Sequence, residues 1–373
     1  MIKVLSVFGT RPEAIKMAPI IKELEKHPDR IVSRVCVTAQ HREMLDQVLS
    51  LFEIVPDYDL DLMQSGQTLS GLTARIFTEL DPVVSREKPD WVLVQGDTTT
   101  VMATSLVAFY HQVKVGHVEA GLRTGNKSQP FPEEINRRMA SVVADLHFAA
   151  TETARNNLLR EGISPGIIRV TGNPVIDALR IVSDAAYDIA RSPLAKIPWD
   201  KRIILVTAHR RENFGKPLER ICAALREIAM QYPDTAYLVY PVHLNPNVQG
   251  LVNTMLSDIP NISLLPPLDY LSFVQVMKRS YLVLTDSGGI QEEAPGLGKP
   301  VLVLREITER PEAVDAGTVR ILGTEQAQIV RGVQSLLDHR AEYERMAHAV
   351  NPYGDGQAAR RIVKAILDQE VAT

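Results

Sequence analysis

Short apolar runs alternate with longer stretches of helical periodicity from the start of the chain. The runs are rich in Val, Ile and Leu, as buried strands are, and between them apolar residues recur every three or four positions. This order of strand, helix, strand predicts parallel sheets with right-handed crossovers. The strands predicted in the first half are Ile2 to Phe8, Ile31 to Val37, Trp91 to Gln95, Lys114 to Val118, Leu146 to Ala149 and Ile168 to Thr171, and the helices are Pro12 to Lys26, His41 to Leu51, Thr68 to Glu87, Thr99 to His111 and Glu134 to Ala144.

The same alternation starts again in the second half of the chain. Several of these runs are apolar at every position, which is typical of strands that helices cover on both faces. A second doubly wound sheet is the simplest account of the pattern. The strands predicted here are Arg202 to Thr207, Ala236 to Tyr240, Ile262 to Leu265, Tyr281 to Thr285, Val301 to Leu304 and Val319 to Leu322.

The fold class predicted from this pattern is α/β, with two Rossmann-like domains. A chain of 373 residues is long for a single core, which also favours two domains. We expect an N-terminal domain of residues 1–172, completed by a C-terminal helix within 356–373, and a second domain of residues 173–355. The stretch from Ser192 to Asp200 is irregular, and we expect a surface loop there, near the boundary.

Composition and charge narrow the functional classes. The formal net charge of -4 provides no basic field for nucleic acid, so an anionic ligand would need a local pocket. Cys36 and Cys222 lack metal-type spacing, and buried thiols in a reducing compartment are the expected state. The apolar N-terminus is too short for a signal peptide, and no apolar run has membrane-spanning length. These features predict a cytoplasmic protein.

The most informative stretch is D-S-G-G-I-Q-E-E-A-P, which begins at Asp286 after a predicted strand. A small-residue turn that opens into a helix, expected from about Ile290, directs free backbone N–H groups at one point and suits a phosphate. Ser287, Gly288 and Gly289 would let a ligand approach the backbone, and Glu292 or Glu293 could hold ribose hydroxyls. The alternative is an ordinary turn with glycines chosen for their dihedral angles.

Charged residues also follow the predicted strands of the first half. Arg11 and Lys16 lie after the first strand, where two cations beside a helix N-terminus can form an anion site. Asp97, Glu119 and Glu133 follow later strands, and converging carboxylates can divide acid and base roles. Each has a structural alternative: the cations can be solvated, Asp97 can cap a helix, and Glu133 can complement a helix dipole.

Two further patterns concern histidine and metal binding. His209 lies beside two arginines at a strand end and is a candidate for an anion site, and His243 is placed similarly with less support. Asp59 and Asp61 form a D-x-D pair, which we interpret as chance in its apolar context. No other stretch has the spacing of metal ligands, so no metal is expected.

Taken together, these motifs resemble those of the bacterial non-hydrolysing UDP-N-acetylglucosamine 2-epimerases. The resemblance covers nearly the whole chain, with the motifs in order. The matching stretches are F-G-T-R-P-E-A-I-K-M-A-P from Phe8, T-A-Q-H-R-E-M-L-D-Q from Thr38, G-D-T-T-T from Gly96, G-H-V-E-A-G-L-R-T from Gly116, H-R-R-E-N from His209, Y-P-V-H-L-N-P from Tyr240, L-T-D-S-G-G-I-Q-E-E-A-P from Leu284, T-E-R-P-E-A from Thr308 and N-P-Y-G-D-G from Asn351.

The resemblance implies a fold of the glycosyltransferase-B type with a ligand cleft between the domains, a homodimer, no metal and no cofactor. It implies reversible C2 epimerisation of UDP-N-acetylglucosamine to UDP-N-acetylmannosamine through loss and return of UDP. It assigns catalytic roles to Asp97, Glu119 and Glu133, with His209 assisting departure of UDP. The implied UDP-binding residues are Arg11, Lys16, Phe273, Ser287, Gly288, Gly289, Glu293 and Arg310.

Regulated members of the family bind a second UDP-N-acetylglucosamine through residues that match Gln40 and His41. Here Gly66 stands where those members have Arg, and Glu43 stands where some have Gln, so substrate activation stays open. Leu268 replaces a Gln that lies near the uracil in a close relative.

Other activities remain open from the sequence. Within the family, the substrate could be a modified UDP-sugar such as a diacetamido uronic acid. A glycosyltransferase of the same fold would need an acceptor site, and a nucleotide-sugar sensor would not need the three acids. Hydrolysing epimerases commonly carry a kinase domain that 373 residues cannot hold.

Overall fold

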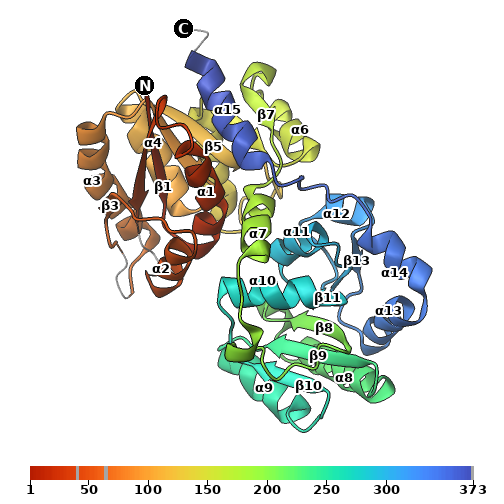
Figure 1. The fold of residues 1–373 in the computed structure, drawn as a ribbon. Helices are drawn as coiled ribbons and strands as arrows, with labels where there is room; N and C mark the ends of the chain where they lie inside the picture. Colours follow the sequence, from red (N-terminus) through yellow and green to blue (C-terminus); the bar gives the residue numbers. More distant parts are fainter. Residues whose placement is uncertain (39–41, 63–65, 371–373) are drawn as a thin grey trace. The chain divides into compact units, whose positions relative to one another are not determined.

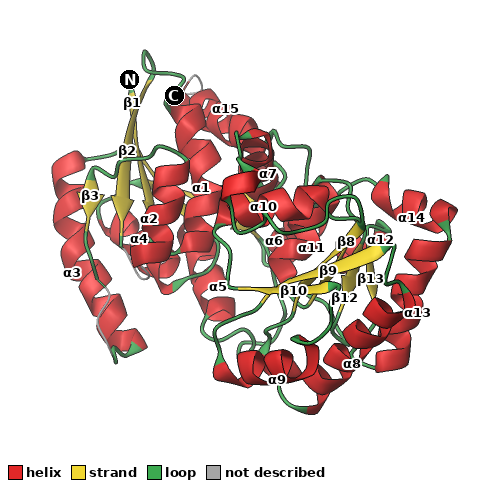
Figure 2. Cartoon of the chain, turned by 60° about the horizontal axis from the view of Figure 1, so that its bottom comes forward, coloured by secondary structure: helices red, strands yellow, loops and turns green. Residues whose placement is uncertain are grey.

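The structure is a computed structural model that describes residues 1–38, 42–62 and 66–370. It divides into two compact units, of which unit 1 comprises Met1–Ala178 with Tyr353–Thr373 and unit 2 comprises Leu179–Pro352. Each unit has one sheet enclosed by helices (Figures 1 and 2). All the strand pairs are parallel, which confirms the predicted α/β class with two doubly wound sheets.

Unit 1 contains a seven-stranded sheet in the order β3-β2-β1-β4-β5-β6-β7. The chain reverses its direction of growth at β1 and β4, which are neighbours, and ligands of open α/β sheets bind at the carboxyl ends of such strands. The strands are β1 (Ile2–Phe8), β2 (Ile31–Val37), β3 (Tyr58–Asp59), β4 (Trp91–Gln95), β5 (Lys114–Ala120), β6 (Leu146–Ala149) and β7 (Ile168–Val170).

The helices of unit 1 form two layers. One layer contains α2, α1 and α15 side by side, and the other contains α3, α4 and α5 (Figure 1). The last helix, α15, thus joins a layer that the start of the chain has built. The helices are α1 (Arg11–Leu24), α2 (Arg42–Leu51), α3 (Leu69–Glu87), α4 (Thr99–Tyr110), α5 (Glu133–Val143), α6 (Glu152–Arg160), α7 (Pro174–Asp184), which runs on into unit 2, and α15 (Ala358–Glu370).

Unit 2 repeats the arrangement with six strands in the order β10-β9-β8-β11-β12-β13. Its switch point lies at β8 and β11, the counterparts of β1 and β4. The elements are β8 (Arg202–Thr207), β9 (Ala236–Pro241), β10 (Ile262–Leu265), β11 (Leu282–Thr285), β12 (Val301–Val303), β13 (Val319–Ile321), α8 (Lys216–Gln231), α9 (Pro246–Leu256), α10 (Tyr270–Arg279), α11 (Gly288–Gly296), α12 (Pro311–Asp315), α13 (Gln326–Asp338) and α14 (Arg340–Ala347).

The predicted elements are present, with small shifts at their ends. The largest difference for function is that α11 begins at Gly288 rather than at Ile290, so both glycines belong to its first turn. The two-residue strand β3 was not predicted, because two residues carry no periodicity. The stretch from Ser192 to Asp200 is irregular as predicted, but Leu194 and Ile197 within it are buried, so it is not simply a surface loop.

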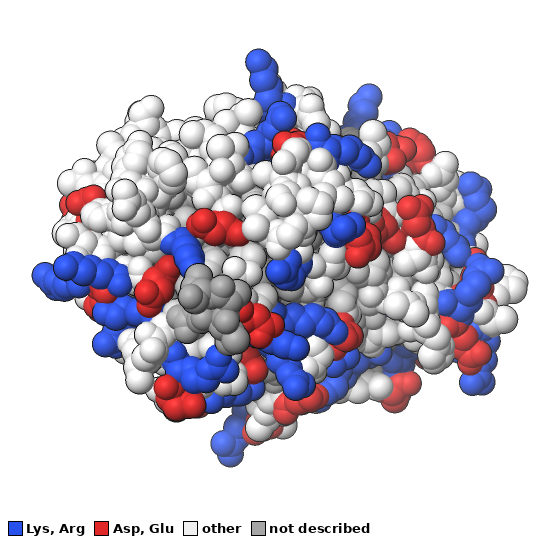
Figure 3. Space-filling view, turned by 90° about the horizontal axis from the view of Figure 1, so that it is seen from above, with Lys and Arg blue, Asp and Glu red and all other residues white. Residues whose placement is uncertain are grey.

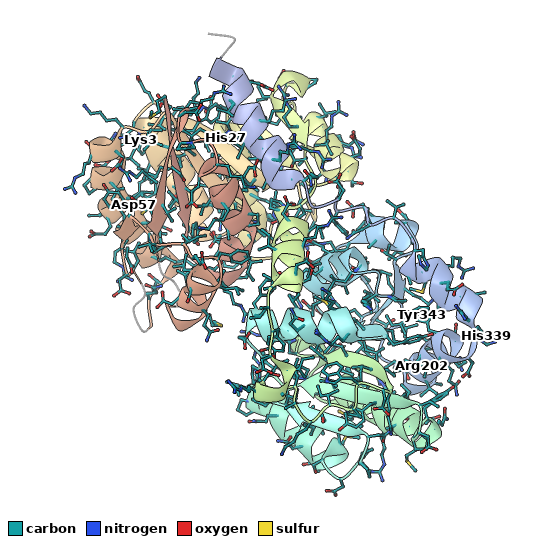
Figure 4. The ribbon with its side chains drawn as sticks, in the orientation of Figure 1. Lys3, His27, Asp57, Arg202, His339 and Tyr343 are labelled. Atoms are coloured by element: carbon teal, nitrogen blue, oxygen red, sulfur yellow. The ribbon has the colours of Figure 1, made fainter. Side chains whose placement is uncertain are left out.

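Aromatic packing and ion pairs secure the starts of the first strands of both sheets. Arg202, at the start of β8, lies over the Tyr281 ring, which stacks on Tyr343 of α14 with the ring centroids 4.0 Å apart (Figure 4). In unit 1, Lys3 near the start of β1 donates to the Glu87 carbonyl at 2.6 Å. These contacts lie at the amino ends of β1 and β8, whereas ligands of open α/β sheets bind at the carboxyl ends.

The face of the molecule in Figure 3 has Lys and Arg interspersed with Asp and Glu. Within the part of the chain that the structure describes, no helix combines the length and the apolar character needed to cross a membrane. Cys36 and Cys222 are free and buried, as predicted, and burial raises the pKa of each thiol to about 12.

Candidate functional site

Glu119 lies at the carboxyl end of β5 in an unusual backbone conformation. Its φ is 61°, which is uncommon for a residue other than glycine, and the pairing of β5 with β6 shifts register between Val118 and Ala120. Such a bulge turns a side chain away from the direction that regular pairing would impose. The Glu119 side chain is nevertheless only 4% exposed.

Three side chains from different segments donate hydrogen bonds to the Glu119 carboxylate. Lys16 Nζ of α1 lies 2.7 and 2.6 Å from the two oxygens, and Asn173 Nδ2 lies 2.9 Å from Oε1. Gln95 Nε2, from the last residue of β4, is the third donor. The structure therefore brings the predicted residues Lys16 and Glu119 together, and it adds two residues that were not predicted.

Asp97 follows β4 and pairs with Arg137 of α5. Its predicted alternative role as a helix cap is taken by Thr98, whose hydroxyl accepts from the Val101 N–H at 3.3 Å. Asn136 Nδ2 donates to the Asp97 carbonyl at 3.0 Å. Because Thr98 caps the helix, the Asp97 carboxylate is left for other contacts, and its side chain is 28% exposed.

Glu133 and Glu134 open α5 but have different surroundings. Glu134 is buried and accepts from the backbone N–H groups of Thr124 and Gly125 at 3.1 and 3.2 Å. Glu133 is half-buried, and its Oε2 atom is buried without a hydrogen-bond partner among the described residues. Glu134 therefore has a structural role, whereas Glu133 has a carboxyl oxygen without a hydrogen-bond partner among the described residues.

Another buried carboxylate, Glu13, joins the turns that follow β1 and β4. Its Oε2 accepts from the N–H groups of Gly9 and Thr10 at 3.1 and 2.7 Å, and its Oε1 accepts from Thr98 Oγ1 at 2.7 Å. Arg11, the first residue of α1, is half-buried and lies two residues before Glu13. Glu13 thus fixes the segments that carry Arg11 and Asp97.

His117, two residues before Glu119, is buried and contacts the same turn. Burial lowers the pKa of His117 to about 4, so the ring is neutral near pH 7. Its Nε2 lies 2.7 Å from the Gly96 carbonyl oxygen, and an N–H on that nitrogen would donate to it. The peptide before Asp97 is therefore held by a neutral histidine.

In unit 2, Asp286 is fully buried and organises the turn after β8. Its Oδ2 accepts from the backbone N–H groups of His209 and Arg210, both at 2.8 Å, and from Asn213 Nδ2 at 3.0 Å. His209 Nδ1 lies 3.7 Å from Asp286 Oδ1, and its ring stacks on His243 at 5.3 Å. Both predicted histidines are therefore brought together.

The amino end of α11 has the features expected of an anion site. Ser287 is the N-cap residue, but no side chain of the described part of the chain caps this end. A Cβ added to Gly288 would lie 4.0 Å from guanidinium atoms of both Arg210 and Arg310. Arg210 Nε is buried without a hydrogen-bond partner among the described residues. Two cations and free backbone N–H groups thus meet at one point.

Glu292 and Glu293 separate into two roles. Glu292 is 1% exposed and pairs with Arg310 Nε, so it positions that arginine. Glu293 accepts from the Tyr270 hydroxyl at 3.0 Å. Burial raises the pKa of Tyr270 well above its usual value, so the phenol remains a donor. Phe273 lies three residues further along α10 and is half-buried.

The comparisons with known proteins agree with these motifs. The model of a protein family described as UDP-N-acetylglucosamine 2-epimerase matches residues 22–367. The UDP-N-acetylglucosamine 2-epimerase of Escherichia coli strain K12 is 57% identical over 376 residues, covering 99% of this chain and 100% of that protein.

The chain belongs to the UDP-N-acetylglucosamine 2-epimerase family.

Two solved structures extend this result. The UDP-GlcNAc 2-epimerase of Neisseria meningitidis, solved with bound UDP-GlcNAc, is 52% identical, with a TM-score of 0.88 over 98% of this chain and 100% of that one. The enzyme of Methanocaldococcus jannaschii, solved with UDP-GlcNAc and UDP, is 34% identical, with a TM-score of 0.81 over 98% and 99% of the two chains. Epimerases of this family thus share the fold across distant organisms.

Beyond the residues that the family resemblance assigned, the structure adds several that sequence reasoning did not assign, among them Gln95, Asn173, Arg210, Glu13 and Tyr270. Two of them carried a signal in the sequence, because Gln95 ends a predicted strand and Asn173 lies in a Gly-Asn-Pro turn after another. Arg210 is one of the two arginines noted beside His209, and Glu13 and Tyr270 are identified only by their contacts.

Some predicted positions lie apart from these contacts. Gln40 and His41 lie outside the described residues. Asp59 and Asp61 belong to no group of metal-ligating side chains within residues 1–38, 42–62 and 66–370.

Proposed function

We propose that the protein catalyses reversible C2 epimerisation between UDP-N-acetylglucosamine and UDP-N-acetylmannosamine. Membership of the 2-epimerase family and the relatives solved with UDP-GlcNAc support this proposal. The observation that carries it is the division of the strand-end residues into two sets. Unit 1 has carboxylates with specific partners, and unit 2 has an uncapped helix end flanked by two guanidinium groups.

Unit 2 supplies groups suited to a nucleoside diphosphate. The amino end of α11 can donate backbone N–H groups to the diphosphate, and Arg310 and Arg210 can neutralise its charge. His209 would assist departure of the diphosphate. Glu293, held by Tyr270, can accept from ribose hydroxyls. A leaving group stabilised in this way lowers the barrier to breaking the C1–O bond.

Unit 1 supplies acid and base groups for the sugar. The hydrogen on C2 has no adjacent carbonyl and is barely acidic, so direct removal would be too slow. In an anti elimination, a carboxylate takes this proton while the C1–O bond breaks and UDP leaves with the electron pair, giving 2-acetamidoglucal. The diphosphate oxygen then adds back to C1, and C2 receives a proton on its other face. Asp97, Glu119 and Glu133 are the proposed acid and base groups.

Proton NMR in deuterated water tests this function. With UDP-N-acetylglucosamine as substrate, we expect UDP-N-acetylmannosamine to appear with deuterium at C2, because the proton is lost before UDP returns. Product that keeps its C2 proton would exclude the elimination route. Free sugar would indicate a hydrolysing enzyme, and turnover only with an added acceptor would indicate a glycosyltransferase.

We further propose that the protein forms a homodimer through exposed apolar residues of unit 1. Ile135, Met139 and Val142 form an exposed stripe along α5, and Phe109 and Tyr110 are exposed at the end of the adjacent α4. An unpaired apolar face of this kind favours burial against another copy.

Light scattering after size exclusion measures the assembly. Val142→Glu, at a residue 82% exposed, should shift the protein toward a monomer, whereas Met230→Glu, at an exposed residue of unit 2, should not. A wild-type monomer at micromolar concentration would contradict the homodimer.

Two finer properties also belong to this proposal. Binding of a second UDP-N-acetylglucosamine by Gln40 and His41 would give a sigmoidal dependence of rate on substrate, and a hyperbolic curve would exclude it. A cytoplasmic location is supported by the free thiols of Cys36 and Cys222, which suit a reducing compartment.

A further inference from the structure

Asn173 occupies a position that the proposed chemistry does not explain. It is 1% exposed and immediately precedes α7, in the short turn that follows β7. Its Oδ1 accepts from the Val175 N–H at 3.1 Å, while its Nδ2 donates to Glu119 Oε1 at 2.9 Å. Because the oxygen is committed to the helix start, the amide nitrogen is directed at the carboxylate.

The backbone of Asn173 holds another segment of unit 1. Its N–H donates to the Tyr353 carbonyl at 2.7 Å, at the residue where the chain returns from unit 2. Gly172 and Gly354 cross closely at this point, since a Cβ on Gly354 would lie 3.2 Å from the Gly172 Cα. Their φ angles of 86° and 124° also disfavour any larger residue.

A second tie lies just beyond this crossing. Asp177 of α7 accepts from the N–H groups of Ala358 and Ala359 at 3.1 and 2.9 Å, at the start of α15. The outgoing and returning segments of the chain are therefore bound to each other within unit 1. Of the residues that make these contacts, Asn173 is the one that also donates to Glu119.

We propose that Asn173 is a positioning residue that holds Glu119 in its reactive orientation and fixes it to the crossing of the two chain segments. The proposal rests on the proposed function, since it takes Glu119 as a reacting group. Lys16 and Gln95 also hold the carboxylate, but they belong to α1 and β4. Asn173 alone among these three donors joins it to the segments through which the chain passes from one unit to the other.

The test compares Asn173→Ala with Asn157→Ala. Asn157 Nδ2 donates at 3.0 Å to the Gly121 carbonyl, two residues beyond Glu119, and so makes a similar bond without touching the carboxylate. Asn173→Ala should lower kcat about 10- to 100-fold, with the KM for UDP-N-acetylglucosamine and the UDP affinity changed less than about 3-fold. Asn157→Ala should leave kcat within about 3-fold of wild type.

Asn173→Asp gives a second test that does not depend on losing the side chain. It keeps the acceptor for Val175 and the bond to Tyr353 but turns a carboxylate toward Glu119. Two adjacent carboxyl groups share a proton more readily at lower pH. The kcat of this variant relative to wild type should therefore rise as the pH is lowered from about 8 to about 6.

The link to the crossing is tested with Gly354→Ala. The added carbon should lower kcat in the wild-type background and have little further effect together with Asn173→Ala. Gly162→Ala is the matched control, because Gly162 has a φ of 85° but no described atom within 4 Å of the added carbon.

The possible failures can be told apart. If the wild-type protein produces no deuterated epimer, the proposed function is wrong. If it does, but Asn173→Ala and Asn173→Asp retain kcat within about 3-fold of wild type, the positioning role is wrong. Additive effects of Gly354→Ala and Asn173→Ala would remove the link to the crossing.

Discussion

Both units use a buried carboxylate to join the turns after the two strands at the switch point. The two switch points differ in which helix ends have side-chain caps. In unit 1, Glu13 ties the turn after β1 to the turn after β4 by accepting from Gly9, Thr10 and Thr98. In unit 2, Asp286 ties the turn after β11 to the turn after β8 by accepting from His209 and Arg210. The carboxylate comes from the first helix in one unit and from a strand end in the other.

This difference determines the chemistry at each switch point. In unit 1, Thr10 and Thr98 cap α1 and α4 with their own side chains, so these helix ends are already satisfied. In unit 2, α11 lacks a side-chain cap from the described residues, and its amino end lies near Arg210 and Arg310. Side-chain caps therefore satisfy the helix ends at one switch point, whereas the other keeps the features expected of an anion site.

The largest expected effect comes from the acids of unit 1. Glu119→Gln removes a proton-transfer group while keeping the shape of the side chain, so kcat should fall about 10²- to 10⁴-fold. Asp97→Asn and Glu133→Gln should behave similarly. UDP affinity, measured by calorimetry, should change little in all three, because we propose that the diphosphate binds in unit 2.

Glu152→Gln is the matched control, since this carboxylate of unit 1 is 70% exposed. Normal turnover in any of the three acid variants would remove that residue from the catalytic set. A parallel loss of UDP affinity would contradict the proposal that unit 1 supplies the acids and unit 2 binds the diphosphate.

The next effect concerns the frame of unit 2. Asp286→Ala would leave the N–H groups of His209 and Arg210 and the Asn213 amide without their buried acceptor, which should destabilise unit 2 by on the order of 3 kcal/mol. Hydrogen exchange of peptides that cover β8 and β11 measures the loss where it occurs. Asp286→Asn, which keeps an acceptor oxygen, should be affected less; equal losses in both variants would contradict this role.

A smaller effect is expected for the cation at the anion site. Arg310→Ala should weaken UDP binding about 10- to 100-fold, because a charge-assisted contact contributes about 1.5 to 3 kcal/mol. Arg340→Ala, at an arginine of unit 2 that is 89% exposed, is the control for loss of charge alone. An unchanged dissociation constant for Arg310→Ala would remove Arg310 from the site.

The sequence was sufficient to predict the fold because several of the buried strands are continuous apolar runs ended by a turn. β1 and β8, for example, have the predicted bounds, since helices cover both of their faces. Asp97 and Glu119 became candidates because they follow predicted strands, and Glu133 because it opens a predicted helix at the same side of the sheet. The family resemblance then assigned their catalytic roles.

Contacts between distant segments could not be predicted in this way. Asn173 contacts Glu119 across 54 residues, and its position in a turn after a predicted strand does not identify that partner. Glu292 looked like a ribose ligand until Arg310, 18 residues away, was found to pair with it. The identity of a capping residue was equally hidden, since Asp97 and Thr98 are both good caps and only tertiary packing selects Thr98.

The last contrast concerns two histidines near the strands, one buried in unit 1 and one accessible in unit 2. His147 of β6 is fully buried, and burial lowers its pKa to about 3, whereas the His209 side chain is 38% exposed. The unfolded chain binds a proton on His147 below about pH 6.5 and the folded unit does not, so stability must fall as the pH drops through this range. At pH 5 the loss from this residue should be about 1 to 2 kcal/mol. His147→Phe should therefore reduce the fall in unit 1 stability between pH 6.5 and pH 5, as measured by hydrogen exchange of β5 and β6. His27→Gln, at a partly exposed histidine after α1, is the control for loss of a histidine alone. An unchanged slope for His147→Phe would show that the acid sensitivity of unit 1 arises elsewhere.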